Sequence, residues 1–117
     1  MAIFARWRPL ATLPPRRGRD AQPGVYELAD AERRTIYIGQ SARDVPNRIR
    51  QHLAAGGCVA QRAAFWRTAY SRVPQAEEAE LLARHRARTG GLPACNEAAP
   101  LRRDAVRRWA ERSRDDG

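Results

Sequence analysis

The chain contains two short segments that have the composition of β-strands. Residues 25–28 are Val-Tyr-Glu-Leu and residues 35–39 are Thr-Ile-Tyr-Ile-Gly, both rich in β-branched and aromatic side chains. The mostly polar residues 29–34 between them suit a β-hairpin with a longer loop. The pattern predicts two adjacent antiparallel strands that carry Tyr26 and Tyr37. A register that puts both side chains on one face would bring their hydroxyls together.

A helix is predicted shortly after the second strand. Asp44 is placed to cap its N-terminus, Pro46 falls in its first turn, and a glycine pair at 56–57 ends it. Arg48 and His52 are four residues apart, so they project together from one side of the helix. The stripe beside them, which we expect to face the core, consists of Val45, Ile49 and Leu53.

The following segments predict a third strand and more helices. Residues 59–64 can form one or two helical turns, and residues 65–73 alternate enough to give a strand that ends at Pro74. Residues 75–88 give the clearest helix, because they are dense in Ala, Leu, Glu and Arg. A last helix is expected over residues 101–114. The whole pattern predicts an α+β domain with a small three-stranded, mainly antiparallel sheet flanked by helices.

One carboxylate lies in the middle of the inward face of the helix at 75–88. On a helical wheel, Glu78 and His85 fall near the centre of that face, whereas Glu77 and Glu80 point away. An unpaired carboxylate there costs on the order of several kcal/mol, so Glu78 requires a cation, a hydrogen-bond network or a metal ion. His85 is expected to be an ordinary buried histidine.

The length of 117 residues is enough for one domain and too short for two. Residues 1–23 are expected to form a basic, proline-rich segment in which Trp7 and Leu10 can fold back as a lid. Residues 24–97 form the domain, and residues 98–117 hold a basic helix. No apolar run approaches the roughly 20 residues of a transmembrane span, and the charged start is unlike a signal peptide.

The two cysteines, Cys58 and Cys95, are far apart and lack the spacing of zinc ligands. The sequence therefore indicates neither a zinc site nor a disulfide scaffold, and both residues are expected to act as small hydrophobic side chains. A reducing, cytoplasmic environment fits this use of cysteine best.

The charge of the chain comes from one basic residue type. All 22 basic residues are arginine and 13 residues are acidic, which gives a net charge of +9. This charge favours a polyanionic partner, because arginine–phosphate contacts release condensed counterions. Part of the excess can reflect a GC-rich coding bias, since alanine also occurs 22 times. Two terminal basic segments can follow a nucleic-acid backbone, through Arg16, Arg17, Arg19, Arg102, Arg103, Arg107 and Arg108.

The predicted elements bring together residue types that phosphodiester hydrolysis uses. The reaction needs a base for the attacking water, positive charge at the phosphorus, and help for the leaving oxygen. A guanidinium can supply the second, and a metal ion held by a carboxylate can supply the third. Tyrosine, with an ordinary pKa of about 10, becomes a credible base where nearby positive charge lowers that pKa.

The order of these residues resembles the GIY-YIG endonuclease family. The resemblance covers residues 24–97. Five segments carry it, in this order: Gly24-Val25-Tyr26, Tyr37-Ile38-Gly39, Arg48 to His52, Glu78 to Leu82, and Pro93-Ala94-Cys95-Asn96. Either tripeptide alone would be weak evidence, whereas five segments in the same order are strong evidence.

The resemblance implies a role for each matched side chain. Tyr26 is expected to be the general base or to position the water, with Tyr37 beside it as a partner or alternate base. Arg48 is expected to bind the scissile phosphate, and His52 to orient the water or the tyrosine. Glu78 is expected to be the one protein ligand of Mg²⁺ or Mn²⁺, with waters and phosphate oxygens completing the shell.

Four further residues are expected to support or extend this site. Asn96 is expected to bind backbone behind the site, and Gly39 belongs to the second tripeptide. Arg43 and Arg50 are expected to contact flanking phosphates, and Arg50 is also the alternative to Arg48, because the spacing from Gly39 is about one residue longer than is common.

The predicted function is therefore metal-dependent hydrolysis of phosphodiester bonds in nucleic acid, with DNA preferred, RNA possible and no membrane association. The sequence has no helix-turn-helix or zinc-finger pattern, so targeting is expected to depend on a protein partner, on dimerisation or on DNA structure. Two alternatives are open. One is a non-catalytic nucleic-acid-binding module that keeps the fold, and the other is an interaction protein that uses Trp7 and Trp109.

Overall fold

The structure is a computed structural model that describes residues 3–14 and 21–97. The helix expected at 101–114, with Trp109 and the C-terminal arginines, lies outside the described residues, as do Arg16, Arg17 and Arg19. No helix in the described part has the length and apolar character that a bilayer crossing requires.

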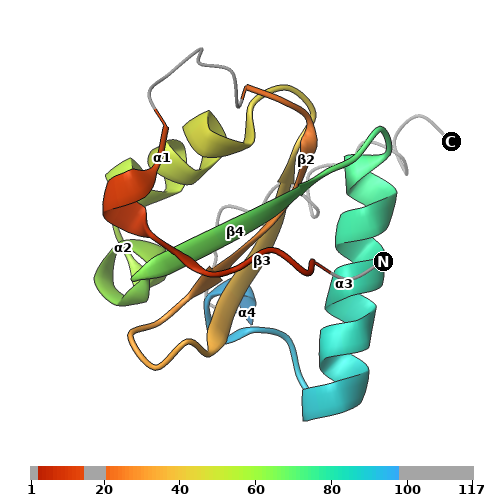
Figure 1. The fold of residues 1–117 in the computed structure, drawn as a ribbon. Helices are drawn as coiled ribbons and strands as arrows, with labels where there is room; N and C mark the ends of the chain where they lie inside the picture. The colour runs from red at the N-terminus through yellow and green to blue at the C-terminus, as the bar shows by residue number, and fades with distance from the viewer. Residues whose placement is uncertain (1–2, 15–20, 98–117) are drawn as a thin grey trace, which may run out of the picture.

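An antiparallel sheet of four strands forms the centre of the domain (Figure 1). The strand order is β1-β4-β2-β3. The strands are β1 (Arg8–Pro9), β2 (Gly24–Ala29), β3 (Thr35–Ser41) and β4 (Phe65–Tyr70). The predicted α+β class and the three longer strands are confirmed.

The fourth strand, β1, comes from the basic, proline-rich N-terminal segment, for which no strand was predicted. Arg8 pairs with Trp66 and Pro9 pairs with Phe65. A proline has no N–H to donate, so this pairing is possible only at the edge of a sheet, where β1 lies. The segment folds back onto the domain, because Trp7 stacks on the Arg67 guanidinium and Leu10 packs against the core.

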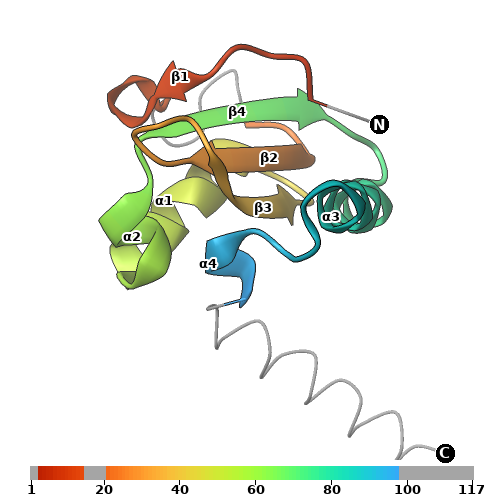
Figure 2. The ribbon, with the colours of Figure 1, turned by 90° about the horizontal axis from the view of Figure 1, so that it is seen from below.

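Helices surround the sheet on more than one side. Figure 2 shows α1 and α2 together under one part of the sheet, with α3 seen end-on away from α2. The helices are α1 (Val45–Ala55), α2 (Cys58–Arg62), α3 (Pro74–Thr89) and α4 (Ala94–Glu97). All but α4 were anticipated within a few residues.

The start and end of α1 follow the predicted local chemistry. The Asp44 side chain accepts a hydrogen bond from the backbone N–H of Asn47 at 3.0 Å, which satisfies one free donor of the first turn. The Ser41 hydroxyl accepts from the N–H of Asp44 at 3.0 Å and so shapes the preceding turn. Gly56 ends the helix with a φ of 76°, a conformation that favours glycine.

Two apolar clusters lie on opposite faces of the sheet. Tyr26 and Tyr37 belong to the cluster that also contains Ile49 of α1. Val25 and Ile38, their neighbours in sequence, belong to the other cluster, which also contains Ile3 and Leu81 of α3. Because successive side chains of a strand point to opposite faces, α1 and α3 cover different sides of the β2–β3 hairpin.

Candidate active site

Tyr26 and Tyr37 lie side by side on the face of the hairpin that α1 covers. The register pairs Tyr26 with Gly39 and Leu28 with Tyr37, which puts both tyrosines on one face. Their ring centroids are 6.1 Å apart and the rings are inclined by 28°. Tyr26 is completely buried and Tyr37 is 3% exposed.

Gly39 gives the tyrosines the space they occupy. A Cβ built at this position would lie 2.5 Å from the Tyr26 Oη and 2.8 Å from Cε1 of Tyr37. Real Cβ atoms do not approach other atoms so closely, so any side chain at residue 39 displaces the rings. The glycine of the second tripeptide is thus needed for packing of the tyrosine from the first.

His52 completes an aromatic cluster with the two tyrosines. Its ring centroid lies 4.7 Å from that of Tyr37 and 6.4 Å from that of Tyr26. His52 is in the last turn of α1 and is half-buried. The structure therefore brings together three of the predicted site residues, from two strands and one helix.

The three arginines assigned to phosphate binding differ in exposure. Arg48 and Arg43 are exposed. The Arg48 Nη1 donates to the Oε1 of Gln51 at 3.2 Å. Arg48 itself lies one helical turn before His52. Arg50 is half-buried, and its Nη2 donates to the Leu13 carbonyl at 3.3 Å. Of the two candidates for the scissile phosphate, Arg48 is therefore the more accessible to a substrate.

Asn96 binds the backbone of β3 behind the tyrosines. Its Oδ1 accepts from the N–H of Ile38 at 2.8 Å, and its Nδ2 donates to the Ile38 carbonyl at 2.9 Å. β3 is an edge strand, so these two backbone groups have no neighbouring strand on that side. The paired hydrogen bonds replace a strand and hold the backbone between Tyr37 and Gly39.

Glu78 is buried, with 7% exposure, on the stripe of α3 that also carries Leu81 and His85. Leu81 packs with Val25 and Ile38, so this stripe lies against the face of the hairpin opposite Tyr26. The predicted burial of Glu78 is confirmed.

Glu77 differs from the prediction that it points away. It is half-buried, and its Oε2 is inaccessible and has no hydrogen-bond partner within the described residues. Glu77 lies in the first turn of α3, where the chain that precedes the helix can cover a side chain that a helical wheel places outward. Glu80 is exposed, as expected.

His85 is buried, as expected for a core residue. Burial lowers the pKa of its imidazole, the Arg88 guanidinium lowers it further, and the Glu27 carboxylate opposes this with a smaller effect. His85 is therefore neutral at neutral pH, which is how an imidazole is tolerated inside a protein.

A partly buried ion pair lies on the α3 side of the sheet, and the sequence analysis did not find it. Arg67 Nε and Nη2 each lie 3.0 Å from the Glu27 Oε1, and the Trp7 ring covers the guanidinium at 3.9 Å. Glu27 follows Tyr26 directly, so alternation along the strand could have placed its side chain on the other face. Its partner is 40 residues away, which no local pattern reveals.

The predicted absence of a disulfide is wrong, because Cys58 and Cys95 form one. The two residues are separated by 37 positions, but α2 and α4 bring their Cα atoms to 5.5 Å, within the range of a bridge. Spacing along the chain does not report this approach. The bridge also removes the reason for expecting a reducing compartment.

The fold and the cluster of paired tyrosines with histidine define a class of small α+β domain built around a β-hairpin. A family model described as the GIY-YIG catalytic domain matches residues 22–83, which is more than half of the chain. The protein belongs to the GIY-YIG family. No curated protein and no solved structure matched the chain significantly.

Membership of this family carries a general function. GIY-YIG domains are typically endonucleases, and they generally use divalent metal ions and act on nucleic acid. In residues 3–14 and 21–97, no three His, Cys, Asp or Glu side chains are grouped as a metal cage. A single buried carboxylate such as Glu78 still fits Mg²⁺, because that ion keeps several waters and takes one or two protein carboxylates plus phosphate oxygens.

Proposed function

We propose that this protein is a divalent-metal-dependent endonuclease that hydrolyses phosphodiester bonds in nucleic acid, with DNA as the preferred substrate. The observation that carries the proposal is the cluster of Tyr26, Tyr37 and His52, packed against Gly39 in a GIY-YIG domain. The net charge of +9 supports a polyanionic substrate.

Each side chain has a proposed task in the reaction. Tyr26 accepts a proton from the attacking water or positions that water, and Tyr37 and His52 orient Tyr26 by contact with its ring. Arg48 binds the scissile phosphate from the exposed side of α1 and stabilises the charge that develops there. Arg43, which is also exposed, contacts a flanking phosphate.

Glu78 would hold Mg²⁺ or Mn²⁺. When bound, such an ion acts as a Lewis acid that stabilises the leaving oxygen. The task of the protein is then to supply one fixed carboxylate, and α3 does so by burying Glu78 on its inward stripe. Because Tyr26 is completely buried, substrate binding has to open the cover of the tyrosines.

Targeting is proposed to depend on a partner, a dimer or a DNA structure. The described residues form the GIY-YIG domain and its edge strand and contain no additional DNA-binding module. Any intrinsic sequence preference should therefore be modest.

A cleavage assay tests the proposal. The full chain is incubated with plasmid, branched DNA and RNA in Mg²⁺ or Mn²⁺, and the products are resolved by electrophoresis. We expect cleavage of DNA, a loss of about 10²- to 10⁴-fold in kcat for Tyr26→Phe, and a loss of about 10²- to 10³-fold for Arg48→Ala. Absence of cleavage by the wild type on all three substrates contradicts the enzymatic proposal.

The neighbouring glutamate provides a matched control for the metal ligand. Glu77→Gln makes the same chemical change one residue earlier in the same helix, so it reproduces the loss of one negative charge near the start of α3. We expect Glu78→Gln to lose cleavage and Glu77→Gln to retain it. The reverse result assigns the metal to Glu77, whose Oε2 is buried without a hydrogen-bond partner among the described residues.

The burial of Tyr26 favours a second candidate, a nucleic-acid-binding module that does not cut. Such a module binds DNA with an affinity that falls with salt, and it is indifferent to Tyr26→Phe and Glu78→Gln. Turnover that depends on either residue, measured beside unchanged DNA binding, decides for the enzyme.

A further inference from the structure

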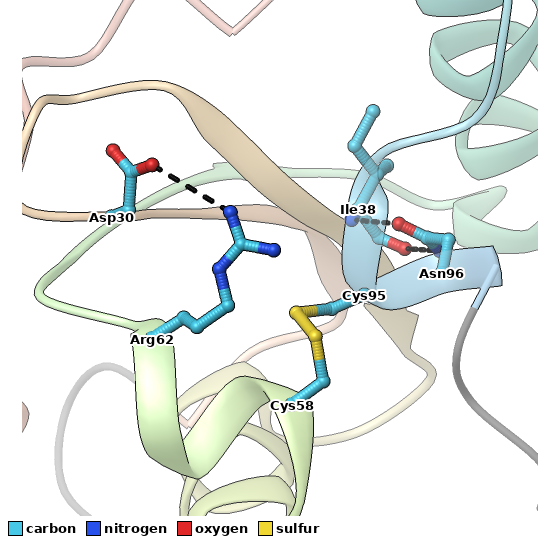
Figure 3. The surroundings of a disulfide bond; sticks show 6 residues. All are labelled: Asp30, Ile38, Cys58, Arg62, Cys95 and Asn96. Atoms are coloured by element: carbon cyan, nitrogen blue, oxygen red, sulfur yellow. Dashed lines mark hydrogen bonds and ion pairs between the residues drawn. A yellow bond between two sulfur atoms is a disulfide. The ribbon is translucent and has the colours of Figure 1, made fainter.

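The Cys58–Cys95 bridge joins two short helices next to the proposed site (Figure 3). Cys58 is the first residue of α2 and Cys95 lies within α4. Cys95 is only 1% exposed and belongs to the same core cluster as Tyr26 and Tyr37. The bridge is thus part of the packing on which the tyrosines rest.

The residue after Cys95 is Asn96, which binds both backbone groups of Ile38. Figure 3 shows the two side chains leaving α4 in different directions, Cys95 to the bridge and Asn96 to β3. Ile38 stands between Tyr37 and Gly39, so a shift of Asn96 changes the support of the strand at the point where the tyrosines pack.

α4 is too short to hold its position by itself. It is four residues long, and its hydrogen bonds within this region run from the N–H groups of Asn96 and Glu97 to the Pro93 carbonyl, at 3.0 and 3.3 Å. A helix of one turn is not stable by itself, because it has too few hydrogen bonds to offset the entropic cost of forming the first turn. Its position therefore depends on tertiary contacts, which include the Asn96 hydrogen bonds, the packing of Cys95 and the bridge.

The other end of the bridge leads back to the same site. α2 follows α1 directly through Gly56 and Gly57, both of which have a positive φ. α1 carries His52, whose ring lies 4.7 Å from that of Tyr37. The bridge consequently closes a ring of contacts that runs from β3 through Asn96, across the sulfurs to α2 and α1, and back through His52.

We propose that Cys58 and Cys95 form a redox-sensitive pair that positions Asn96 and, through it, the Tyr37 segment of β3. The part of this proposal that concerns catalysis rests on the proposed nuclease function. Cys58, Cys95 and Asn96 are positioning residues, since they act on the site through Ile38 and touch no substrate.

The chemical step is thiol–disulfide exchange with a dithiol reductant. A thiolate of the reductant attacks one sulfur, the Cys58–Cys95 bond breaks, and a mixed disulfide forms. The second thiolate of the reductant then releases the remaining cysteine. Two electrons and two protons finish on Cys58 and Cys95, and the reductant becomes a disulfide. Attack is easier at Cys58, because Cys58 is half-buried whereas Cys95 is almost completely enclosed.

Amide hydrogen exchange of the full chain tests the positioning without any assay of activity. The oxidised protein is compared with protein reduced by dithiothreitol, and the loss of the bridge is checked by mass. The Ile38 N–H donates to the Asn96 Oδ1. We expect reduction to accelerate exchange of this amide at least tenfold more than exchange of the amides that pair β2 with β4. Equal acceleration at Ile38 and at the β2–β4 amides means that the bridge stabilises the whole domain, which overturns the proposal. No acceleration at Ile38 also overturns it.

Cys58→Ala gives the same comparison in the absence of reductant. Its β2–β4 amides should remain protected, which shows that the domain is folded, while the Ile38 amide exchanges as in the reduced wild type. If the Ile38 amide of folded Cys58→Ala exchanges as slowly as in the oxidised wild type, the proposal is overturned.

The activity test uses labelled DNA in Mn²⁺. We expect reduction to lower kcat about tenfold with KM changed less than twofold, and Cys58→Ala to be equally slow and insensitive to dithiothreitol. An active enzyme whose kcat is unaffected by reduction overturns the link to the site. If neither redox state cleaves DNA, the nuclease proposal fails, and the Ile38 exchange result still decides whether the bridge positions β3.

Discussion

At the scale of single residues, the site depends on one glycine and one asparagine that touch no substrate in the proposed reaction. Gly39 leaves the volume into which the Tyr26 ring fits, and Asn96 binds the backbone beside it. The chemical groups of Tyr37 and His52 are then placed by packing, with ring centroids 4.7 Å apart. The positions of the aromatic rings are therefore set by the space that Gly39 leaves and by the backbone contacts of Asn96.

Gly39→Ala should destabilise the fold and disturb the tyrosines together. The added methyl group would meet the Tyr26 hydroxyl and the Tyr37 ring in a fully packed region, and overpacking of this kind costs about 1–3 kcal/mol. Urea unfolding measures the change. Gly91→Ala is the matched control, because its Cβ would lie 3.5 Å from the Glu97 Oε1, which is an ordinary contact distance. Equal stability of both variants would contradict this account of Gly39.

At the scale of elements, α1 is the part of the fold that joins the proposed phosphate contact to the aromatic cluster. It carries Arg48 on its exposed side and His52 in its last turn, half-buried against Tyr37. Its own buried residues are Val45, Pro46 and Ile49. The helix is short, so its N-cap has a large share in fixing where both functional side chains lie.

Asp44→Ala should lower the free energy of unfolding by about 1 kcal/mol, because the N–H of Asn47 loses its hydrogen-bond acceptor. Asp44→Asn keeps a side-chain oxygen at the cap and should cost much less. Thermal unfolding of both variants gives the comparison. An alanine variant as stable as the asparagine variant would show that the cap contributes nothing measurable.

At the scale of the whole molecule, the arginine excess acts as a field in addition to the individual contacts. The described arginines include several that are committed to the fold, such as Arg67 on Glu27 and Arg50 on the Leu13 carbonyl. Arg43 and Arg48 are exposed and available for phosphates. The net charge of +9 thus overstates the number of phosphate contacts the domain can make.

Binding of DNA should weaken as salt rises. Two arginine–phosphate contacts alone predict a loss of about tenfold between roughly 50 and 200 mM salt, since each contact contributes a slope of about −0.9. Fluorescence anisotropy with a labelled duplex measures this, and Arg43→Ala should reduce the slope by about one contact. An affinity independent of salt would count against a phosphate-binding surface and favour the interaction-protein alternative.

The sequence by itself determined the elements and their chemistry, because both depend on neighbours along the chain. The strands that carry Tyr26 and Tyr37, the cap at Asp44 and the helix that buries Glu78 were predictable from alternation, capping residues and helical spacing. The order of motifs also predicted the family.

Only the tertiary structure decided which distant residues meet. The Cys58–Cys95 bridge, the Glu27–Arg67 pair and the pairing of β1 with β4 each join segments about 40 or more residues apart, and no periodicity encodes such approaches. The strand register decided that Gly39 lies under Tyr26, and strand alternation decided that the α3 stripe lies on the other face. Side-chain packing selects these arrangements, so they exist only once the whole core has formed.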